Sequence, residues 1–244
     1  SDDVEVVLPE MDREDVAYLF RQRDLVTAPV VDKSGRLIGQ ITFDDIVDVI
    51  EEEVQEDAFK LAGVGADNLY SAVLETVQNR FSWLVLNLVT AIAASFVISR
   101  FQAEIEKTVA LAVLMPIIAS MGGNAGTQTL TIAVRSLATK DIDPSNYMRF
   151  IRKESLTGLA NGILFAFLSG LITFLWFEDT ALGLLVAVAM TINLMLAGLA
   201  GITIPIALSK LKIDPAASSS VLLTTVTDTA GFLTFLALAS IFLV

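Results

Sequence analysis

One acidic residue near the end of the chain, Asp228, could carry chemistry because of where it stands. It lies within the stretch TTVTDTAG, and neither residues 215–227 nor residues 229–244 contain another charge. A carboxylate in the middle of a helix that faces lipid costs several kcal/mol, so acids at such positions usually mark an ion pathway. No Lys or Arg lies deep inside any apolar run to pair with it. We expect this carboxylate to be protonated, hydrated in a pore or paired with a cation. The structural alternative is a neutral acid bonded to one of its threonine neighbours, which are Thr224, Thr225, Thr227 and Thr229.

A second apolar run, MPIIASMGGNAGTQ, combines polar residues with residues that disturb helices. Pro116 removes a helical hydrogen bond, and irregular backbone at membrane depth is tolerated only inside protein or beside a water-filled cavity. Asn124 and Gln128 are four residues apart and share one helical face. This favours a pore lining, although the glycines could instead serve close helix packing. The candidate pore residues here are Gly122, Gly123, Asn124 and Gln128. A further polar set either lines the same cavity or is simply packed, namely Asn193, Gly198, Gly201 and Pro205.

Acidic residues are concentrated in DDIVDVIEEEVQEDAFKLAG, which begins at Asp44. Their mutual repulsion destabilises a helix unless a countercharge binds. One interpretation is a solvated connecting helix, and the other is a divalent-cation sensor in which metal neutralises acids brought together from several elements or subunits. The acids at helical spacing are Asp45, Asp48, Glu52, Glu53, Glu56 and Asp57.

The composition restricts the chemistry. The 244 residues are 54% hydrophobic and include neither His nor Cys, so any bound metal would meet oxygen ligands, which favours Mg²⁺, Ca²⁺ or Mn²⁺. Residues 1–80 carry 19 acidic and 7 basic side chains, whereas residues 81–244 carry nine of each. An acidic head argues against nucleic acid as a partner. No nucleophile–base pair and no phosphate-cradling loop occurs, so we predict that the chain is not an enzyme.

Five long runs without charge predict five transmembrane helices, since a span needs about 20 apolar residues. We therefore predict a mainly α, polytopic membrane protein preceded by a small α/β module and an acidic connecting helix. The predicted spans are residues 81–99, 108–134, 155–177, 180–209 and 216–244.

The basic residues predict the orientation of these spans. The loops after the second and fourth spans are rich in Lys and Arg, whereas the turn after the third has only Glu178 and Asp179. Because Lys and Arg favour the cytoplasmic side, we expect a cytoplasmic N-terminus and an extracellular or periplasmic C-terminus in the cell (inner) membrane.

The first 53 residues alternate strand and helix patterns. We expect a strand over residues 4–8, a helix over 12–23, two strands around a DKSG hairpin turn and a helix over 43–53. The stretch TAPVVDKSGRLIGQITFDDIVDVI closely resembles a CBS (cystathionine β-synthase-type) motif. Such motifs normally work in pairs, and residues 1–53 look like the second of a tandem whose first half is missing. We expect residues 54–80 to form an acidic connecting helix and linker, and residues 81–244 the pore domain.

The CBS motif, the acidic helix, five spans, PIIASMGGNAGTQ and DPAASSSVLLTTVTDTAGF together resemble the MgtE family of magnesium channels and transporters. The resemblance implies a homodimer in the lipid bilayer, with its Mg²⁺ path on the two-fold axis and Asp228 of both copies as the central site. It also places Gly122, Gly123, Asn124 and Gln128 near that site and Asp214 near the cytosolic end of the pore. The further candidate pore-lining residues are Ser220, Thr224 and Thr225. It implies that intracellular Mg²⁺ gates the pore through the acids Asp45, Asp48, Glu53, Glu56 and Asp57.

The sequence departs from this family in two ways. The family's N-terminal acidic helical domain and first CBS motif are not found, and a serine around Ser220 replaces an expected asparagine. Ion selectivity among Mg²⁺, Co²⁺ and Mn²⁺, the direction of transport, energy coupling and the hydration of the bound ion all stay open. Two alternatives also stay open. One is a divalent-cation exchanger or efflux transporter, and the other is a non-conducting membrane CBS sensor that binds an adenine nucleotide.

Overall fold

The computed structural model describes residues 5–64 and 72–243. The chain divides into two compact units, Ser1–Phe59 and Lys60–Val244, and each is described by itself. The division falls inside one helix, α2 (Phe43–Leu61), so the expected helix over residues 43–53 and the start of the acidic connecting helix form a single element.

The first unit is built around a two-stranded antiparallel sheet, β1 (Thr27–Val31) and β2 (Leu37–Thr42), in which Thr27 pairs with Thr42. Their hairpin turns at Gly35, which has a φ of 79°. The expected first strand is reduced to one parallel bridge between Val7 and Val30, and Val4 lies outside the described residues. Helix α1 (Arg13–Arg23) is capped by Asp12, whose side chain accepts from the Glu14 N–H. The small core contains Val7, Val16, Phe20, Ala28 and Ile46.

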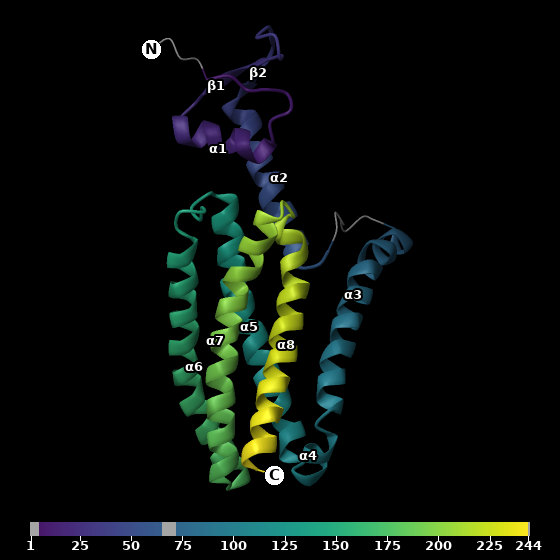
Figure 1. Cartoon of the computed structure of the whole chain (residues 1–244). Coiled ribbons are helices and arrows are strands. Elements are labelled where there is room, and N and C mark those ends of the chain that lie inside the picture. The colour runs from purple at the N-terminus through teal and green to yellow at the C-terminus, as the bar shows by residue number, and fades with distance from the viewer. Residues whose placement is uncertain (1–4, 65–71, 244) are drawn as a thin grey trace. The chain divides into compact units, whose positions relative to one another are not determined.

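The second unit is a helical bundle, and its described residues include five helices long and apolar enough to cross a membrane (Figure 1). This confirms the predicted fold class and the five spans. A short helix, α4 (Gln102–Lys107), joins the first two. The other elements are α3 (Val73–Ser99), α5 (Ala110–Ala138), α6 (Tyr147–Phe177), α7 (Thr180–Lys210) and α8 (Pro215–Phe242).

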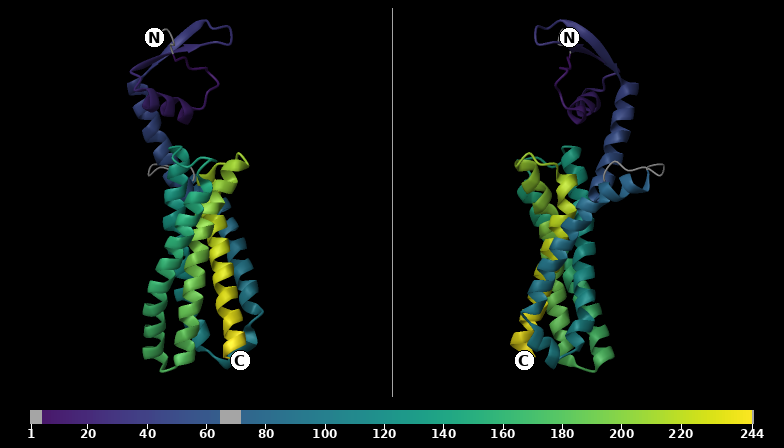
Figure 2. Two further views of the ribbon diagram at one scale, coloured as in Figure 1. Left: turned by 60° about the vertical axis from the view of Figure 1, so that its left-hand side comes forward. Right: turned by 90° about the vertical axis from the view of Figure 1, so that its right-hand side faces the viewer.

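Helix α7 is the centre of this bundle. It packs against α5, α6 and α8, whereas α3 contacts mainly α8, and both views in Figure 2 agree with this arrangement. In its most apolar stretch 56% of the α7 residues are buried, against 6% for α3. The largest core cluster joins α5, α7 and α8 through residues such as Leu111, Ile118, Leu194 and Phe235. Helices α5, α7 and α8 therefore hold one another in place, and α3 leaves most of its apolar surface uncovered.

Glycines bring α6 and α7 into backbone contact. A Cβ atom added at Gly158 would lie 2.7 Å from the Leu194 carbonyl oxygen, and one at Gly162 would lie 2.9 Å from that of Thr191. In the opposite direction, a Cβ at Gly198 would lie 2.9 Å from the Glu154 carbonyl oxygen. Small residues allow this close approach between membrane helices. The two helices form a tightly packed antiparallel hairpin.

Two expectations about helix boundaries need correction. The backbone of α5 is not broken at Pro116, because the helix is continuous from Ala110 to Ala138. Helix α3 begins at Val73, before the expected Phe81, because a helix continues through polar residues that a count of apolar residues excludes. Residues 65–71 of the expected linker lie outside the described residues.

Candidate cation path and acidic helix

The face of α8 that carries Asp228 is polar and only partly covered. Ser220, Thr224 and Asp228 are spaced four residues apart and so share one side of the helix, and all three are exposed or partly exposed. The hydroxyl groups of Thr224 and Thr225 donate to carbonyls of their own helix, those of Ser220 and Val221. Such back-bonding leaves oxygen lone pairs available as acceptors. The side of α8 around Asp228 therefore offers oxygen ligands.

Within the described residues, Asp228 has no hydrogen bond and no ion pair. The expected structural alternative, a neutral acid bonded to a neighbouring threonine, is thus not seen. The Thr227 hydroxyl donates instead to the Thr224 carbonyl at 3.2 Å, and the buried Thr229 hydroxyl has no partner in the described chain.

Helix α5 has two faces with different surroundings. Gly122 and Gly126 are buried and allow close packing: added Cβ atoms would lie 2.5 Å from Asn193 Nδ2 and 2.9 Å from a methyl carbon of Leu223. Gly123 has no heavy atom within 4 Å of an added Cβ. Asn124 and Gln128 are exposed, and Asn124 Nδ2 lies 3.4 Å from the Ser120 hydroxyl. The packing interpretation therefore holds for Gly122 and Gly126, while Gly123, Asn124 and Gln128 face open space.

The structure brings the two sets of candidate pore residues onto neighbouring helices, since α5 packs against α8 through contacts such as Gly126 with Leu223. In the described part of the chain no hydrogen bond joins the two sets, and no group of three or more Asp or Glu side chains could hold a metal ion. A single copy therefore presents polar surface but not a complete metal site.

Asp214 occupies the start of α8. Its Oδ1 accepts from the Ala216 N–H at 2.8 Å, and its Oδ2 lies 2.6 Å from Lys60 Nζ. An acid at this position satisfies a free backbone N–H and interacts favourably with the helix dipole. Both contacts are structural, and any part that Asp214 plays in binding a cation would compete with them.

The acids of α2 have different surroundings. Asp45 Oδ2 accepts from both the N–H and the hydroxyl of Thr42, each at 2.8 Å, a contact of the capping-box kind. These hydrogen bonds hold the Asp45 pKa below its ordinary value. Glu53 forms an ion pair with Arg13 at 3.1 Å, and Glu56 and Asp57 also have interaction partners. Of the five expected sensor acids, only Asp48 has no hydrogen bond and no ion pair within the described residues.

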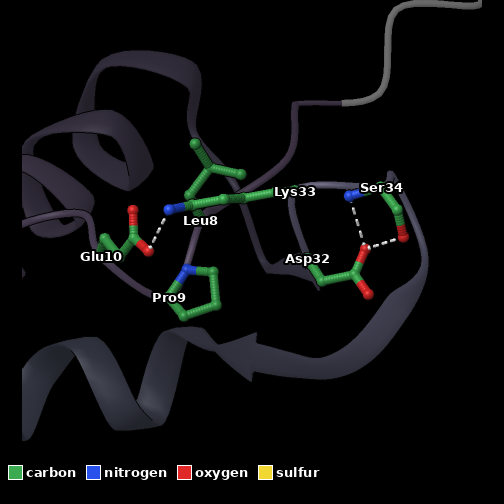
Figure 3. A pocket seen from close by; sticks show the side chains of 6 residues that line it. All are labelled: Leu8, Pro9, Glu10, Asp32, Lys33 and Ser34. Carbon is green, nitrogen blue, oxygen red and sulfur yellow. Dashed lines mark hydrogen bonds and ion pairs between the residues drawn. The ribbon is translucent and has the colours of Figure 1, made fainter.

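The first unit contains a pocket of about 440 Å³, shown in Figure 3. Lys33 is the basic group in its lining, and its Nζ lies 2.8 Å from Glu10 Oε1. The Asp32 carboxylate accepts from the Ser34 hydroxyl and from the Arg36 and Ser34 N–H groups. The bond from the Ser34 hydroxyl, followed by that from the Arg36 N–H, holds the Asp32 pKa below its ordinary value. Two carboxylates against one paired lysine make this lining unfavourable for the phosphates of a nucleotide. The described pocket gives no support to the adenine-nucleotide expectation.

Sequence reasoning missed one buried acid and left one buried amide undecided. Glu154 of α6 is 8% exposed, accepts from the Thr129 hydroxyl at 3.3 Å and lies 3.3 Å from Lys153 Nζ. Glu154 directly precedes the expected third span. Because that span was defined as a run without charged residues, it starts after Glu154 and leaves this acid out. Asn193 is 1% exposed, so it is packed inside the bundle.

The comparisons with known proteins agree with the motifs. Residues 115–238 match the MgtE family, described as a divalent cation transporter, and residues 1–52 match the CBS domain. The chain is 36% identical over 95% of its length to the magnesium transporter MgtE of Enterococcus faecalis, covering 51% of that protein. It is 35% identical over 97% of its length to the magnesium transporter MgtE of Thermus thermophilus, covering 53% of it. The chain thus spans about half the length of the curated relatives it matches. Because its described residues include five apolar helices and residues 115–238 match the family, this chain is a multi-pass membrane protein of the MgtE family.

Proposed function

We propose that this chain moves Mg²⁺ across the cell membrane along a path lined by α5 and α8, with Asp228 as its central ion-binding residue. The observation that carries the proposal is the surroundings of Asp228: a carboxylate within an apolar helix, without a partner in the described chain, on a face with Ser220 and Thr224. A carboxylate in such a place is expected to face a water-filled path. The relatives named as magnesium transporters support the choice of ion.

A homodimer would complete the path. One copy supplies a single acid at this depth, whereas two copies related by a two-fold axis would place two Asp228 carboxylates across the axis. Asn124 and Gln128 of α5 are exposed on a helix otherwise suited to lipid, and a second copy facing a watery path would explain that exposure. Mg²⁺ loses its waters reluctantly and is usually held by one or two carboxylates together with water. The Thr224 and Thr225 hydroxyls, with the backbone beside Gly123, would orient those waters.

Intracellular Mg²⁺ would regulate the path through α2. Its acids repel one another, and Mg²⁺ bound between copies would relieve this repulsion and hold a closed state. A fall in internal Mg²⁺ would then open the path. This assigns the N-terminus to the cytoplasm and the C-terminus to the opposite side, in agreement with the basic loops that follow α5 and α7.

The experiment for the path uses the full chain in liposomes that contain a Mg²⁺-sensitive dye. We expect Asp228→Ala and Asp228→Asn to lower the initial rate of Mg²⁺ entry about tenfold or more, since a charge-assisted contact worth about 1.5–3 kcal/mol is lost. Glu178→Gln is the matched control, because it also removes one carboxylate charge but from the exposed turn between α6 and α7. Wild-type rates in both Asp228 variants would refute the pore site, and the absence of Mg²⁺ entry in the wild type itself would favour the non-conducting sensor.

The experiment for regulation varies the Mg²⁺ concentration on the cytoplasmic side. We expect the combined variant Glu53→Gln/Glu56→Gln/Asp57→Asn to lose inhibition by Mg²⁺, whereas Glu51→Gln on the same helix keeps it. Equal inhibition of the combined variant and the wild type would contradict the sensor assignment while leaving the path intact.

A further inference from the structure

Asn193 of α7 is a buried amide at the meeting point of three helices. It is 1% exposed, and its Nδ2 donates to the Ile118 carbonyl of α5 at 2.6 Å. Its Oδ1 is buried without a hydrogen-bond partner in the described chain. Burying an amide with an unpaired acceptor is unfavourable. An aliphatic residue would fill an apolar helix interface without this penalty, so packing alone does not explain the amide.

Two glycines on the proposed path helices make room for this side chain. A Cβ added at Gly122 of α5 would lie 2.5 Å from Asn193 Nδ2, and one added at Gly231 of α8 would lie 3.0 Å from Asn193 Oδ1. The amide therefore occupies the space of two absent side chains, one on each helix. If α5 moved toward α8 near Gly122 and Gly231, both helices would press on the Asn193 side chain.

The position of Asn193 along both helices connects it with the path. Gly122 directly precedes Gly123 and Asn124, and Gly231 lies three residues after Asp228, on the same side of α8. Ile118 lies two residues after Pro116 on α5. The bond from Asn193 thus ties α5, one turn before Gly122, to α7, the most buried helix of the bundle.

We propose that Asn193 is a positioning residue for cation passage: it sets the spacing of the Gly123 turn of α5 from the Asp228 turn of α8 and thereby influences which divalent ion passes. The inference rests on the proposed function. Asn193 touches no ion in this arrangement and acts through the two helices on either side of it. Its loss should change ion preference more than it changes folding.

The first experiment compares initial rates of Mg²⁺ and Co²⁺ entry into liposomes. We expect Asn193→Ala to change the ratio of the two rates about fivefold, the factor that corresponds to one ordinary hydrogen bond. The double variant Asn193→Ala/Gly122→Ala refills part of the space with a methyl group but does not restore the bond to Ile118, so its ratio should stay altered. Thr173→Val is the matched control, because Thr173 is a buried polar residue of α6, outside the helices that Asn193 joins. A wild-type ratio in Asn193→Ala would overturn the inference, and a ratio that stays altered in the double variant would support a role for the bond to Ile118 in setting the spacing.

The second experiment does not depend on transport. The sequence has no cysteine, so single cysteines at the exposed positions Val113 of α5 and Leu233 of α8 can carry spin labels, with labelled protein diluted in unlabelled protein. We expect Asn193→Ala to broaden or displace the distance distribution between the labels, and Thr173→Val to leave it unchanged. An unchanged distribution in Asn193→Ala would refute the positioning role. If the wild type conducts neither ion, the proposed function fails, and the label distances still decide the role of Asn193.

Discussion

Replacing Gly123 with alanine should separate stability from transport. Gly123 lies on α5 with no heavy atom within 4 Å of the position that a Cβ would take. Gly158 of α6 is the matched comparison, because its Cβ would lie 2.7 Å from the Leu194 carbonyl oxygen. Both positions are inside long helices, so both substitutions gain the same intrinsic preference of alanine for the helix.

The expected magnitudes follow from these surroundings. Alanine is favoured over glycine inside a helix by about 1 kcal/mol, and nothing opposes this gain in Gly123→Ala. Ordinary contact begins near 3.4 Å, so Gly158→Ala must move α6 from α7 by about 0.7 Å. Overpacking of this kind costs about 1–3 kcal/mol, which cancels or exceeds the gain. Gly123→Ala should therefore be more stable than Gly158→Ala by about 1–3 kcal/mol.

The functional expectation has the opposite sign. If Gly123 faces the ion path, an added methyl group narrows it, and Gly123→Ala should transport Mg²⁺ more slowly although the protein is more stable. Thermal unfolding in detergent measures the first quantity, and dye-based Mg²⁺ entry into liposomes measures the second. Equal destabilisation by the two alanines would refute the open surroundings of Gly123. Wild-type transport by a stabilised Gly123→Ala would refute its place beside the path.

Two further predictions concern helix starts. Asp214→Ala should destabilise the second unit by about 1–2 kcal/mol, because it removes both the cap of α8 and the half-exposed ion pair with Lys60; Asp179→Ala, which removes only the cap of α7, should cost less in the same thermal unfolding measurement. Asp45 has a lowered pKa, so its contribution to α2 is present above the unfolded value of about 3.9 and is lost as pH falls through the folded value. Amide exchange in the first turn of α2 should therefore differ between wild type and Asp45→Ala at pH 5, and the difference should shrink below pH 4; a difference independent of pH would contradict the capping role.

The fold was largely predictable because lipid imposes a simple condition on the sequence. A span must be long and free of charge, and this condition alone locates all five helices. The helix ends were less predictable, since α3 begins among polar residues at Val73 and α6 includes Glu154. Helix α5 continues through Pro116, as membrane helices do where neighbouring groups satisfy the freed backbone carbonyl, and no local pattern reports such neighbours.

Part of the candidate site was also predictable from the sequence, and part was not. The spacing of Asn124 with Gln128, and of Thr224 with Asp228, is visible in the sequence because a helix places residues four apart on one side. It is harder to recognise from the sequence that an acid expected to bind a cation also caps a helix. Asp45 follows Thr42 at the spacing of a capping box, but within an acidic run this local pattern is hidden by the charge. The burial of Asn193 needs three helices at once and leaves no signature along the chain.

The backbone contacts between α6 and α7 limit how the bundle can deform. Carbonyl oxygens sit against glycines at Gly158, Gly162 and Gly198, so sliding one helix along the other would drive larger side chains into those oxygens. The hairpin is consequently stiff toward axial displacement and can take part in a conformational cycle only as a single body. An opening movement would then be a tilt of α3, α5 or α8 relative to the α6–α7 hairpin. The glycine contacts within this hairpin would be the same in the closed and the open state.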